Sequence, residues 1–204
     1  ELPEATGWQV PIFVKLGASR VYDDVKLAAK AGADVVVVDG MEGGTGASPA
    51  IFQDHTGIPT LAAVCEARAA LEDMGLYGKV QLIIAGGIRD GVDAAKAMAL
   101  GADAIYIGTA ALIALNCNRP LYVDDYHKLG TEPHFCHHCH TGQCPVGVTT
   151  QDPELMKRLP IDEAAERVTN LLRAMTLEIQ MLARSCGKSD VHNLEPEDMA
   201  ALTP

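Results

Sequence analysis

One short unit of sequence repeats along the first half of the chain and constrains the fold more than any other feature. Each unit is an apolar run rich in β-branched residues, a glycine turn and an alanine-rich helical segment. The four runs cover residues 12–17, 34–40, 80–87 and 103–109. Because the runs are continuous rather than alternating, they are typical of parallel strands covered on both faces. Repeated strand and helix units of this kind predict a parallel α/β architecture.

Two of these units are near copies of each other. AKAGADVVVVDG (residues 29–40) and AMALGADAIYIG (residues 97–108) both end a helix at a glycine, Gly32 or Gly101, before the next strand. This regularity favours a (β/α)₈ TIM barrel over a doubly wound sheet, and no G-x-G-x-x-G fingerprint is present. Four strands make only half of such a barrel and leave two unpaired edges. We therefore expect the chain to be a fragment, or a partner chain to supply the first half.

Composition divides the chain into three parts. Residues 1–115 carry the repeated units and form the expected half-barrel. Residues 116–160 are rich in Pro, His, Gly and Cys and lack periodicity, which predicts a Cys/His-rich loop. Residues 161–204 are expected to be a helical extension, with one long amphipathic helix that ends at Gly187 and a short terminal helix within residues 193–202.

Composition also excludes several classes of function. A hydrophobic content of 48% with 21% charged residues is that of a globular protein. The net charge of −11 gives nucleic-acid phosphates little reason to bind. No apolar run is long enough to cross a bilayer, and no basic-then-apolar signal opens the chain. We expect a cytoplasmic protein with neither nucleic acid nor membrane as a partner.

Glycines follow the last two predicted strands, where barrels of this type commonly bind phosphate. The segments are IIAGGIRDG (residues 83–91) and YIGTAA (residues 106–111). Backbone N–H groups at Gly86, Gly87 and Gly108 can approach phosphate oxygens, and both loops lead into helices whose dipoles favour an anion. Arg89 adds a possible charged donor. The alternative is that these glycines only form tight turns.

Two further features follow the first and second predicted strands. Lys15 lies where barrel strands present catalytic side chains, and a lysine inside an apolar strand is unusual. A cation there could stabilise a reduced anionic flavin or a substrate carboxylate. The loop DGMEGGTGASP (residues 39–49) has glycines that can lie against a flat ligand, with Thr45 and Ser48 as possible hydrogen-bond donors.

The six cysteines indicate metal or redox chemistry rather than a disulfide framework, because no export signal is present and cytosolic thiols are kept reduced. Cys65 and Cys186 stand alone in helix-like surroundings and are expected to be inert buried thiols. The other four are candidate metal ligands: Cys117, Cys136, Cys139 and Cys144. By themselves, the Cys-x₂-Cys pair and the neighbouring His137, His138 and His140 favour tetrahedral zinc.

Three motifs in the same order resemble the FMN-binding synthase domain of the glutamate synthase family. They cover residues 14–49, 85–115 and 139–155. The resemblance implies an FMN barrel of which this chain carries strands five to eight. It also implies an oxidoreductase that aminates 2-oxoglutarate with ammonia, the flavin reducing a 2-iminoglutarate intermediate.

The resemblance also implies roles for individual residues. Lys15 is similar to the family's lysine near flavin and substrate. The family's loop beside the flavin corresponds to Gly43, Gly44, Thr45 and Gly46. Its FMN phosphate loops correspond to Gly86, Gly87, Arg89, Gly108 and Thr109.

The resemblance shifts the expected metal centre from zinc to an iron–sulfur cluster. The family's three ligands follow a C-x₅-C-x₄-C pattern that ends before Pro-Val-Gly, and Cys139 and Cys144 take the last two places. Cys117 falls at the first place, but an insertion that contains Cys136 separates it from Cys139. Either all four cysteines ligate one cluster, of the 3Fe–4S or 4Fe–4S type, or Cys136 replaces Cys117. A set of soft thiolates beside a flavin suits such a cluster.

The resemblance leaves the nitrogen and electron donors open. Complete enzymes of the family make ammonia in a glutaminase domain that this chain lacks, so we expect an oligomer with glutaminase and electron-donor subunits, or the use of free ammonium. One alternative is an N-methylglutamate synthase subunit that uses methylamine. Another is a non-catalytic flavin and cluster subunit for electron transfer or assembly. An intact Lys15 and glycine loop favour catalysis.

Overall fold

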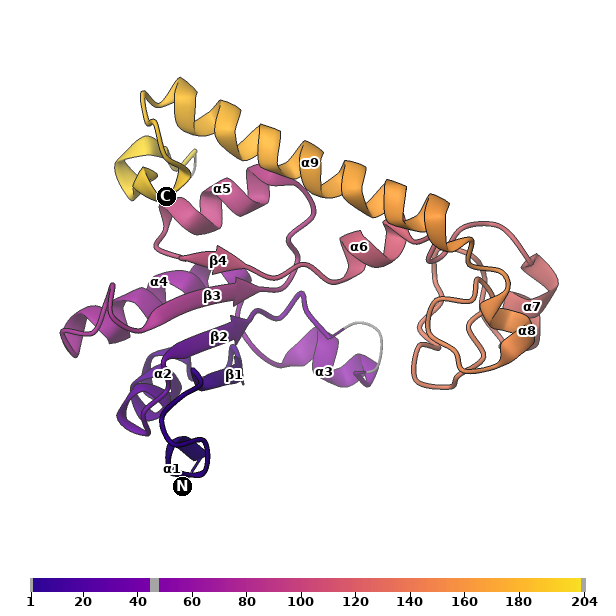
Figure 1. The fold of residues 1–204 in the computed structure, drawn as a ribbon, viewed down its shortest axis with the longest axis horizontal. Coiled ribbons are helices and arrows are strands. Elements are labelled where there is room, and N and C mark those ends of the chain that lie inside the picture. Colours follow the sequence, from indigo (N-terminus) through magenta and orange to yellow (C-terminus); the bar gives the residue numbers. More distant parts are fainter. Residues whose placement is uncertain (1, 45–47, 203–204) are drawn as a thin grey trace.

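A four-stranded parallel sheet forms the centre of the computed structural model, which describes residues 2–44 and 48–202. Its strands pair in chain order: β1 (Phe13–Gly17), β2 (Val35–Asp39), β3 (Gln81–Ala85) and β4 (Ala104–Ile105). All four arrows in Figure 1 point the same way, toward the side of α3 and α6. A doubly wound sheet would reverse its strand order, whereas a barrel keeps it. The predicted α/β class and partial barrel are therefore confirmed.

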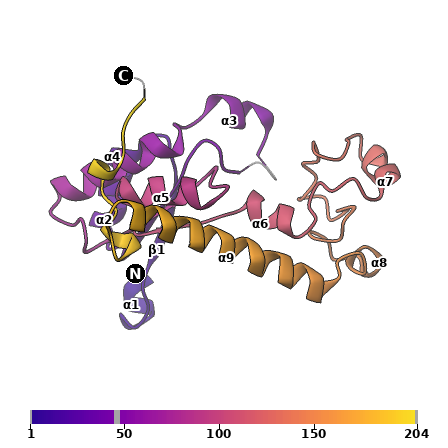
Figure 2. The ribbon, with the colours of Figure 1, turned by 90° about the horizontal axis from the view of Figure 1, so that it is seen from above.

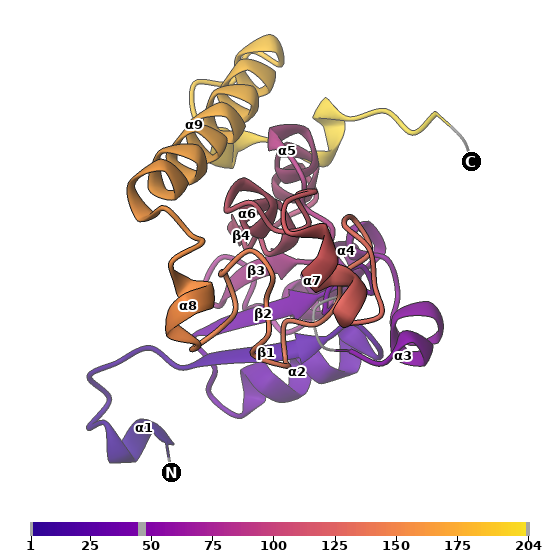
Figure 3. The same cartoon turned by 90° about the vertical axis from the view of Figure 1, so that its right-hand side faces the viewer.

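The helices follow the strand and helix alternation predicted from the sequence. Between and after the strands lie α2 (Val21–Lys30), α3 (Ala50–His55), α4 (Thr60–Asp73), α5 (Gly91–Ala99) and α6 (Thr109–Ala114). The remaining elements are α1 (Leu2–Ala5), α7 (Val123–Lys128), α8 (Pro153–Met156), α9 (Ile161–Ser185) and two 3₁₀ turns, η1 (Val191–Asn193) and η2 (Pro196–Asp198). Figure 3 shows α1 standing away from the sheet and its helices.

The two near-copy units end their helices in the same way. Gly32 and Gly101 have φ values of 91° and 121°, which an L side chain rarely adopts. After α2, the Ala33 N–H donates to the Ala28 carbonyl at 3.1 Å. After α5, the Ala102 N–H makes the equivalent bond at 3.0 Å. Both are Schellman motifs, so the predicted C-terminal glycines are confirmed.

The sheet has a helix-covered face and a lumen face. Val36 and Val38 belong to the main core with the helices, whereas Val35 and Val37 form a separate small cluster with Ile83. Successive residues of a strand point to opposite faces, so residues in register share a face. The lumen face is therefore the one that carries the functional side chains at the strand ends.

Helix α9 is the longest helix among the described residues. It packs along α5 and α6 and reaches the segment that holds α7 and α8 (Figure 2). Its close approach to α5 depends on Gly91, whose N–H donates to Glu178 Oε2 at 2.7 Å. A Cβ at this position would lie 2.4 Å from the Met175 carbonyl oxygen. At the other end of α9, Arg167 Nε donates to the Ala114 carbonyl at 2.9 Å and holds α6.

Two expectations from the sequence were wrong. The chain has the turns η1 and η2 where a short terminal helix was predicted within residues 193–202. There the Glu195 and Asp198 side chains bond each other's backbone N–H groups in a capping box, which starts the turn η2, and the extended backbone of Met199 ends it. Cys65 and Cys186 are exposed rather than buried, because they lie on the outer faces of their helical segments.

Among the residues that the structure describes, no helix combines the length and the apolar character needed to cross a membrane.

Gly91→Ala should lower the free energy of unfolding by about 1–3 kcal/mol, because an overpacked contact must push α9 away from α5. Urea unfolding followed by circular dichroism measures the change. Val92→Ala is the matched control, since its half-exposed side chain lies one residue along α5 and should alter stability by no more than about 0.5 kcal/mol. Equal stability of both variants would show that the α5–α9 contact tolerates a methyl group.

Candidate active site

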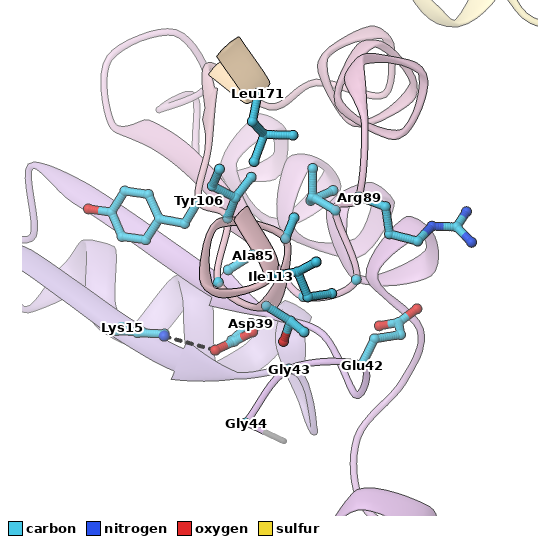
Figure 4. A pocket seen from close by; sticks show the side chains of 17 residues that line it. Lys15, Asp39, Glu42, Gly43, Gly44, Ala85, Arg89, Tyr106, Ile113 and Leu171 are labelled. Carbon is cyan, nitrogen blue, oxygen red and sulfur yellow. Dashed lines mark ion pairs between the residues drawn. The ribbon is translucent and has the colours of Figure 1, made fainter. Parts of the chain in front are cut away.

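A cavity of about 850 Å³ lies at the C-terminal ends of the strands (Figure 4). Barrel enzymes place their active sites at this end. The structure brings most of the sequence-predicted residues together there: Lys15, Gly43, Gly44, Gly86, Gly87, Arg89, Gly108 and Thr109. Thr45 and Gly46 lie outside the described residues.

Lys15 forms an ion pair with Asp39 across two neighbouring strands. The Lys15 ammonium lies 2.8 Å from Asp39 Oδ2, and Figure 4 shows the two side chains meeting at the cavity. Lys15 is in register with Val37 and Asp39 with Gly17, so both side chains point to the lumen face. The other carboxylate oxygen of Asp39 lies against Gly43, where a Cβ would be only 2.1 Å away. The glycine loop can therefore close directly over this carboxylate.

A second polar network joins the loop after β2 to the loop after β3. The buried Thr60 hydroxyl lies 2.7 Å from Glu42 Oε2 and 2.8 Å from the Gly86 carbonyl oxygen. The Thr60 N–H donates to the same Glu42 oxygen at 3.0 Å, so Glu42 satisfies a free N–H in the first turn of α4. A Cβ at Gly40 would lie 1.9 Å from the Thr60 hydroxyl oxygen, which explains the glycine there.

The glycines at the cavity have different reasons to be glycine. Gly86 and Gly87 have φ values of 103° and 69°, and a Cβ on either would press on the loop after β2. Their turn and packing roles thus account for them without a ligand. Gly108 is different, because its φ is −122° and a Cβ would meet nothing within 4 Å. Gly108 is the N-cap of α6, where glycine is favoured, and it leaves open space at the cavity.

Arg89 extends away from Lys15 and Asp39 (Figure 4). Its guanidinium is bound to Asp93, with Nε 2.8 Å and Nη2 3.2 Å from the two carboxylate oxygens. These hydrogen bonds lower the pKa of Asp93 despite its partial burial. Arg89 thus lines the cavity, but its guanidinium is paired with Asp93 in the first turn of α5.

Protein carboxylates already occupy the N-terminus of α5. The Asp90 side chain accepts hydrogen bonds from Val92 and Asp93 N–H at 3.0 and 2.9 Å, and Glu178 accepts from Gly91 N–H. These negative charges already interact with the positive end of the α5 dipole, which was expected to favour a phosphate. A phosphate in this cavity would therefore have to use groups other than the start of α5.

Sequence reasoning missed three cavity residues that carry polar groups. Asp39 could have been found as the one acid at the end of a valine run, in register with the cavity end of β1. Tyr106 could have been found from its spacing of two residues from Ala104, which places both on one face. Glu42 gave no signal, because its role depends on Thr60 at the start of α4.

The four candidate cysteine ligands line a second, smaller cavity of about 20 Å³. They are Cys117, Cys136, Cys139 and Cys144, and His138 and Tyr126 also line this cavity. We call it the thiol cavity. Within the described ranges, no three His, Cys, Asp or Glu side chains converge as a single metal ion would require. The four thiols therefore share a cavity without meeting at one point.

The thiols differ in electrostatic environment. Burial, followed by the charges of the other three cysteines, raises the pKa of Cys117 to about 11. Burial also raises the pKa of Cys144, but hydrogen bonds from the backbone N–H groups of residues 146, 148 and 149 outweigh it and the net pKa is lowered. Burial and nearby cysteine charges raise the pKa of Tyr126 to about 12, so its hydroxyl remains a donor at neutral pH.

Helix α6 is the wall between the two cavities. Leu112 lines the thiol cavity, and its neighbour Ile113 lines the larger cavity. Thr109 at the start of α6 borders the larger cavity, while Cys117 follows shortly after the helix ends. The rise along six helical residues is about 9 Å. The two cavities are thus close neighbours.

A sequence model of the conserved region in glutamate synthase matches residues 1–189, almost the whole chain. The chain belongs to the glutamate synthase family. This result confirms the resemblance carried by the three sequence motifs.

Two relatives within the glutamate synthase family are longer than this chain. The glutamate synthase large subunit-like protein of Rhizobium meliloti (strain 1021) is 56% identical over 203 residues, which are 100% of this chain and 46% of that protein. The archaeal glutamate synthase (NADPH) of Methanocaldococcus jannaschii is 42% identical over 194 residues, which are 95% of this chain and 35% of that protein. The chain spans less than half the length of either relative.

Solved structures agree with the partial barrel. A mutant flavocytochrome b2 with pyruvate bound matches 96% of this chain and 36% of its own chain, with a TM-score of 0.56 and 21% identity. At that identity the likeness concerns the fold alone.

Thr60→Val should lower the free energy of unfolding by about 1–3 kcal/mol, because it leaves the Gly86 carbonyl without the hydroxyl beside it and removes the hydroxyl contact with Glu42. Thr60→Ser keeps the hydroxyl and should lose only about 0.8 kcal/mol for the missing methyl group. Urea unfolding of both variants measures the difference. If the valine variant proves as stable as the serine variant, the hydroxyl does not tie the two loops together.

Proposed function

We propose that the chain is the C-terminal part of the FMN-binding domain of a glutamate synthase-type oxidoreductase, which makes glutamate from 2-oxoglutarate and ammonia by reductive amination. One observation carries this proposal. Lys15 and the glycine loops after β2, β3 and β4 converge on a single cavity, in a chain of the glutamate synthase family.

The cavity fits FMN by size and by the open space beside Gly108. Ligand pockets usually enclose about 300–1,000 Å³, and the cavity lies within that range. Backbone N–H groups of Gly86, Gly87 and Gly108 would hold the phosphate, and the loop of Gly43 and Gly44 would lie beside the ring system. When bound, FMN supplies the hydride that reduces the imine carbon.

Lys15 brings a positive charge to the lumen side of the cavity, and Asp39 fixes its position. An ammonium there stabilises a substrate carboxylate or any group that gains negative charge during the reaction. The Lys15 side chain is 58% exposed and Asp39 only 22%, so the carboxylate anchors a cation that would otherwise turn to solvent. Because Asp39 also touches Gly43, the pair aligns an anionic substrate with the glycine loop.

The thiol cavity would hold an iron–sulfur cluster that passes electrons toward the flavin one at a time. Its donor set fits, since soft thiolates are the ligands of such clusters and the Tyr126 hydroxyl is buried without a partner. The cavity is small, so the thiols would turn outward around the cluster. Zinc is the alternative metal, but zinc draws its ligands to one ion, whereas a cluster spreads them over several irons.

The proposed reaction needs a supply of ammonia and a supply of electrons. Ammonia would come from a glutaminase subunit or from free ammonium, and electrons from a donor subunit that reaches the thiol cavity. The wall of one helix between the thiol cavity and the larger cavity favours this relay over a purely structural metal centre. An N-methylglutamate synthase would use the same flavin cavity with methylamine as its amine.

Gly108→Leu should weaken FMN binding more than tenfold in the complete protein, because the side chain would fill the cavity that FMN needs. Gly108→Ala should weaken it less, and the thermal midpoint of both variants should stay near that of the parent. Fluorescence titration of the deflavinated protein with FMN measures the affinity. Unchanged affinity in Gly108→Leu would mean that FMN does not bind beside this glycine.

Lys15→Met should lower kcat/KM for glutamate formation at least 100-fold, as expected for the loss of a charge that acts on the reacting groups. The assay uses the complete protein with its partner subunits, 2-oxoglutarate and a reductant, and supplies ammonium, glutamine or methylamine in separate arms. Lys30→Met, on the exposed end of α2, is the control and should be fully active. No product in any arm from the parent protein would contradict the proposed reaction, and N-methylglutamate alone would identify the methylamine enzyme.

A further inference from the structure

We propose that Cys136 is a fourth cluster ligand, so that the insertion between Cys117 and Cys139 converts a three-cysteine pattern into a four-thiolate site. The inference rests on the proposed cluster and goes beyond it, since it fixes the ligand set and the cluster type. It is argued from the contacts that hold the insertion against the thiol cavity.

The first contact is a clamp between Asn118 and Cys136. The Cys136 N–H donates to Asn118 Oδ1 at 3.0 Å, and Asn118 Nδ2 donates to the Cys136 carbonyl at 3.4 Å. Asn116 and Asn118 have φ values of 77° and 59°, so the chain turns sharply on both sides of Cys117. The turn that presents Cys117 thus also grips the backbone of Cys136.

The second contact fastens α7, which lies within the insertion, to the Cys144 segment. Arg158 Nη1 donates to Asp125 on α7 at 2.7 Å and to the Pro145 carbonyl at 2.8 Å. Its guanidinium also lies over the Tyr122 ring, 4.2 Å from the centroid. One arginine therefore holds α7 beside the residue that follows Cys144.

The third observation is an unpartnered donor at the thiol cavity. Tyr126 on α7 is 1% exposed, lines this cavity, and its hydroxyl has no hydrogen-bond partner. A buried hydroxyl without an acceptor is unfavourable. A cluster sulfide or ligand sulfur provides that acceptor. The insertion therefore contributes a thiol and a hydrogen-bond donor to the same space.

Four cysteines predict a cluster in which each of four irons has a protein ligand. Four-thiolate sites are typical of [4Fe–4S] clusters. With only three cysteine ligands, one corner of such a cluster would lack a protein thiolate. The insertion thus replaces the three-iron alternative with a closed four-iron centre.

The test compares the complete protein with its Cys136→Ala variant, both purified without oxygen. The parent should contain about four irons and four labile sulfides per chain and show a four-iron signal by Mössbauer spectroscopy. Cys136→Ala should keep its FMN and shift to a three-iron signal. Cys186→Ala, an exposed cysteine outside the thiol cavity, is the control and should match the parent.

The outcomes separate this inference from the proposed function. A parent without labile sulfide, or with one zinc per chain, overturns the cluster itself and this inference with it. A four-iron parent whose Cys136→Ala variant keeps the same signal overturns the fourth ligand alone. So does a parent that already contains a three-iron cluster.

Two milder variants keep the test decisive if Cys136→Ala fails to fold. Asn118→Ala retains all four thiols but releases the backbone of Cys136, and should speed loss of iron to a chelator several-fold. Tyr126→Phe should lower the midpoint potential of the cluster, because the hydrogen bond to sulfur stabilises its more negative, reduced form. Unchanged iron loss and an unchanged potential would together overturn the role of the insertion.

Discussion

The register of the parallel strands is the constraint on which the site depends. In the strand register, Lys15 lies opposite Val37, and Asp39 lies opposite both Gly17 and Ala85. Side chains in register share one face of the sheet. A shift by one residue would turn Lys15 and Asp39 into the helix-covered core, where an ion pair would lose its solvation. The burial of Val36 and Val38 against the helices makes that shift costly. The apolar core thus determines where the charged pair points.

Helix α9 holds in place the two helices that follow β3 and β4. It is tied to α5 through Gly91 and Glu178, and to α6 through Arg167, while Leu171 reaches the larger cavity. The segment of residues 116–160 has few buried apolar residues of its own. It is held instead by polar clamps and by its attachment to α6 and α9. The geometry of the thiol cavity is therefore set mainly by these clamps and not by a core of its own.

Sequence alone predicted the strands, the glycine helix ends and the loops that meet at the cavity, because these follow from local periodicity and turn chemistry. It also predicted that Lys15 lies at the cavity end of its strand, since a charge in an apolar strand is conspicuous. The partners of these residues were harder to predict. The pairing of Arg89 with Asp93, and the occupation of the α5 N-terminus by Asp90 and Glu178, depend on side-chain geometry and on a helix far along the chain. The Asn118 clamp likewise gave no signal, because Cys136 lies 18 residues away.

Helix α6 separates the two cavities, and this separation affects how electrons and substrates would reach them in the proposed function. Leu112 and Ile113 are adjacent, yet each lines a different cavity. A covalent, hydrogen-bonded helix fixes the spacing between the two, so the rate of a transfer across it would not vary with the motion of a hinge or a lid. Under the proposed function, an electron donor would dock at the thiol cavity while substrates enter the larger cavity by another route. The electrons and the substrates, 2-oxoglutarate and ammonia, would then not compete for one entrance.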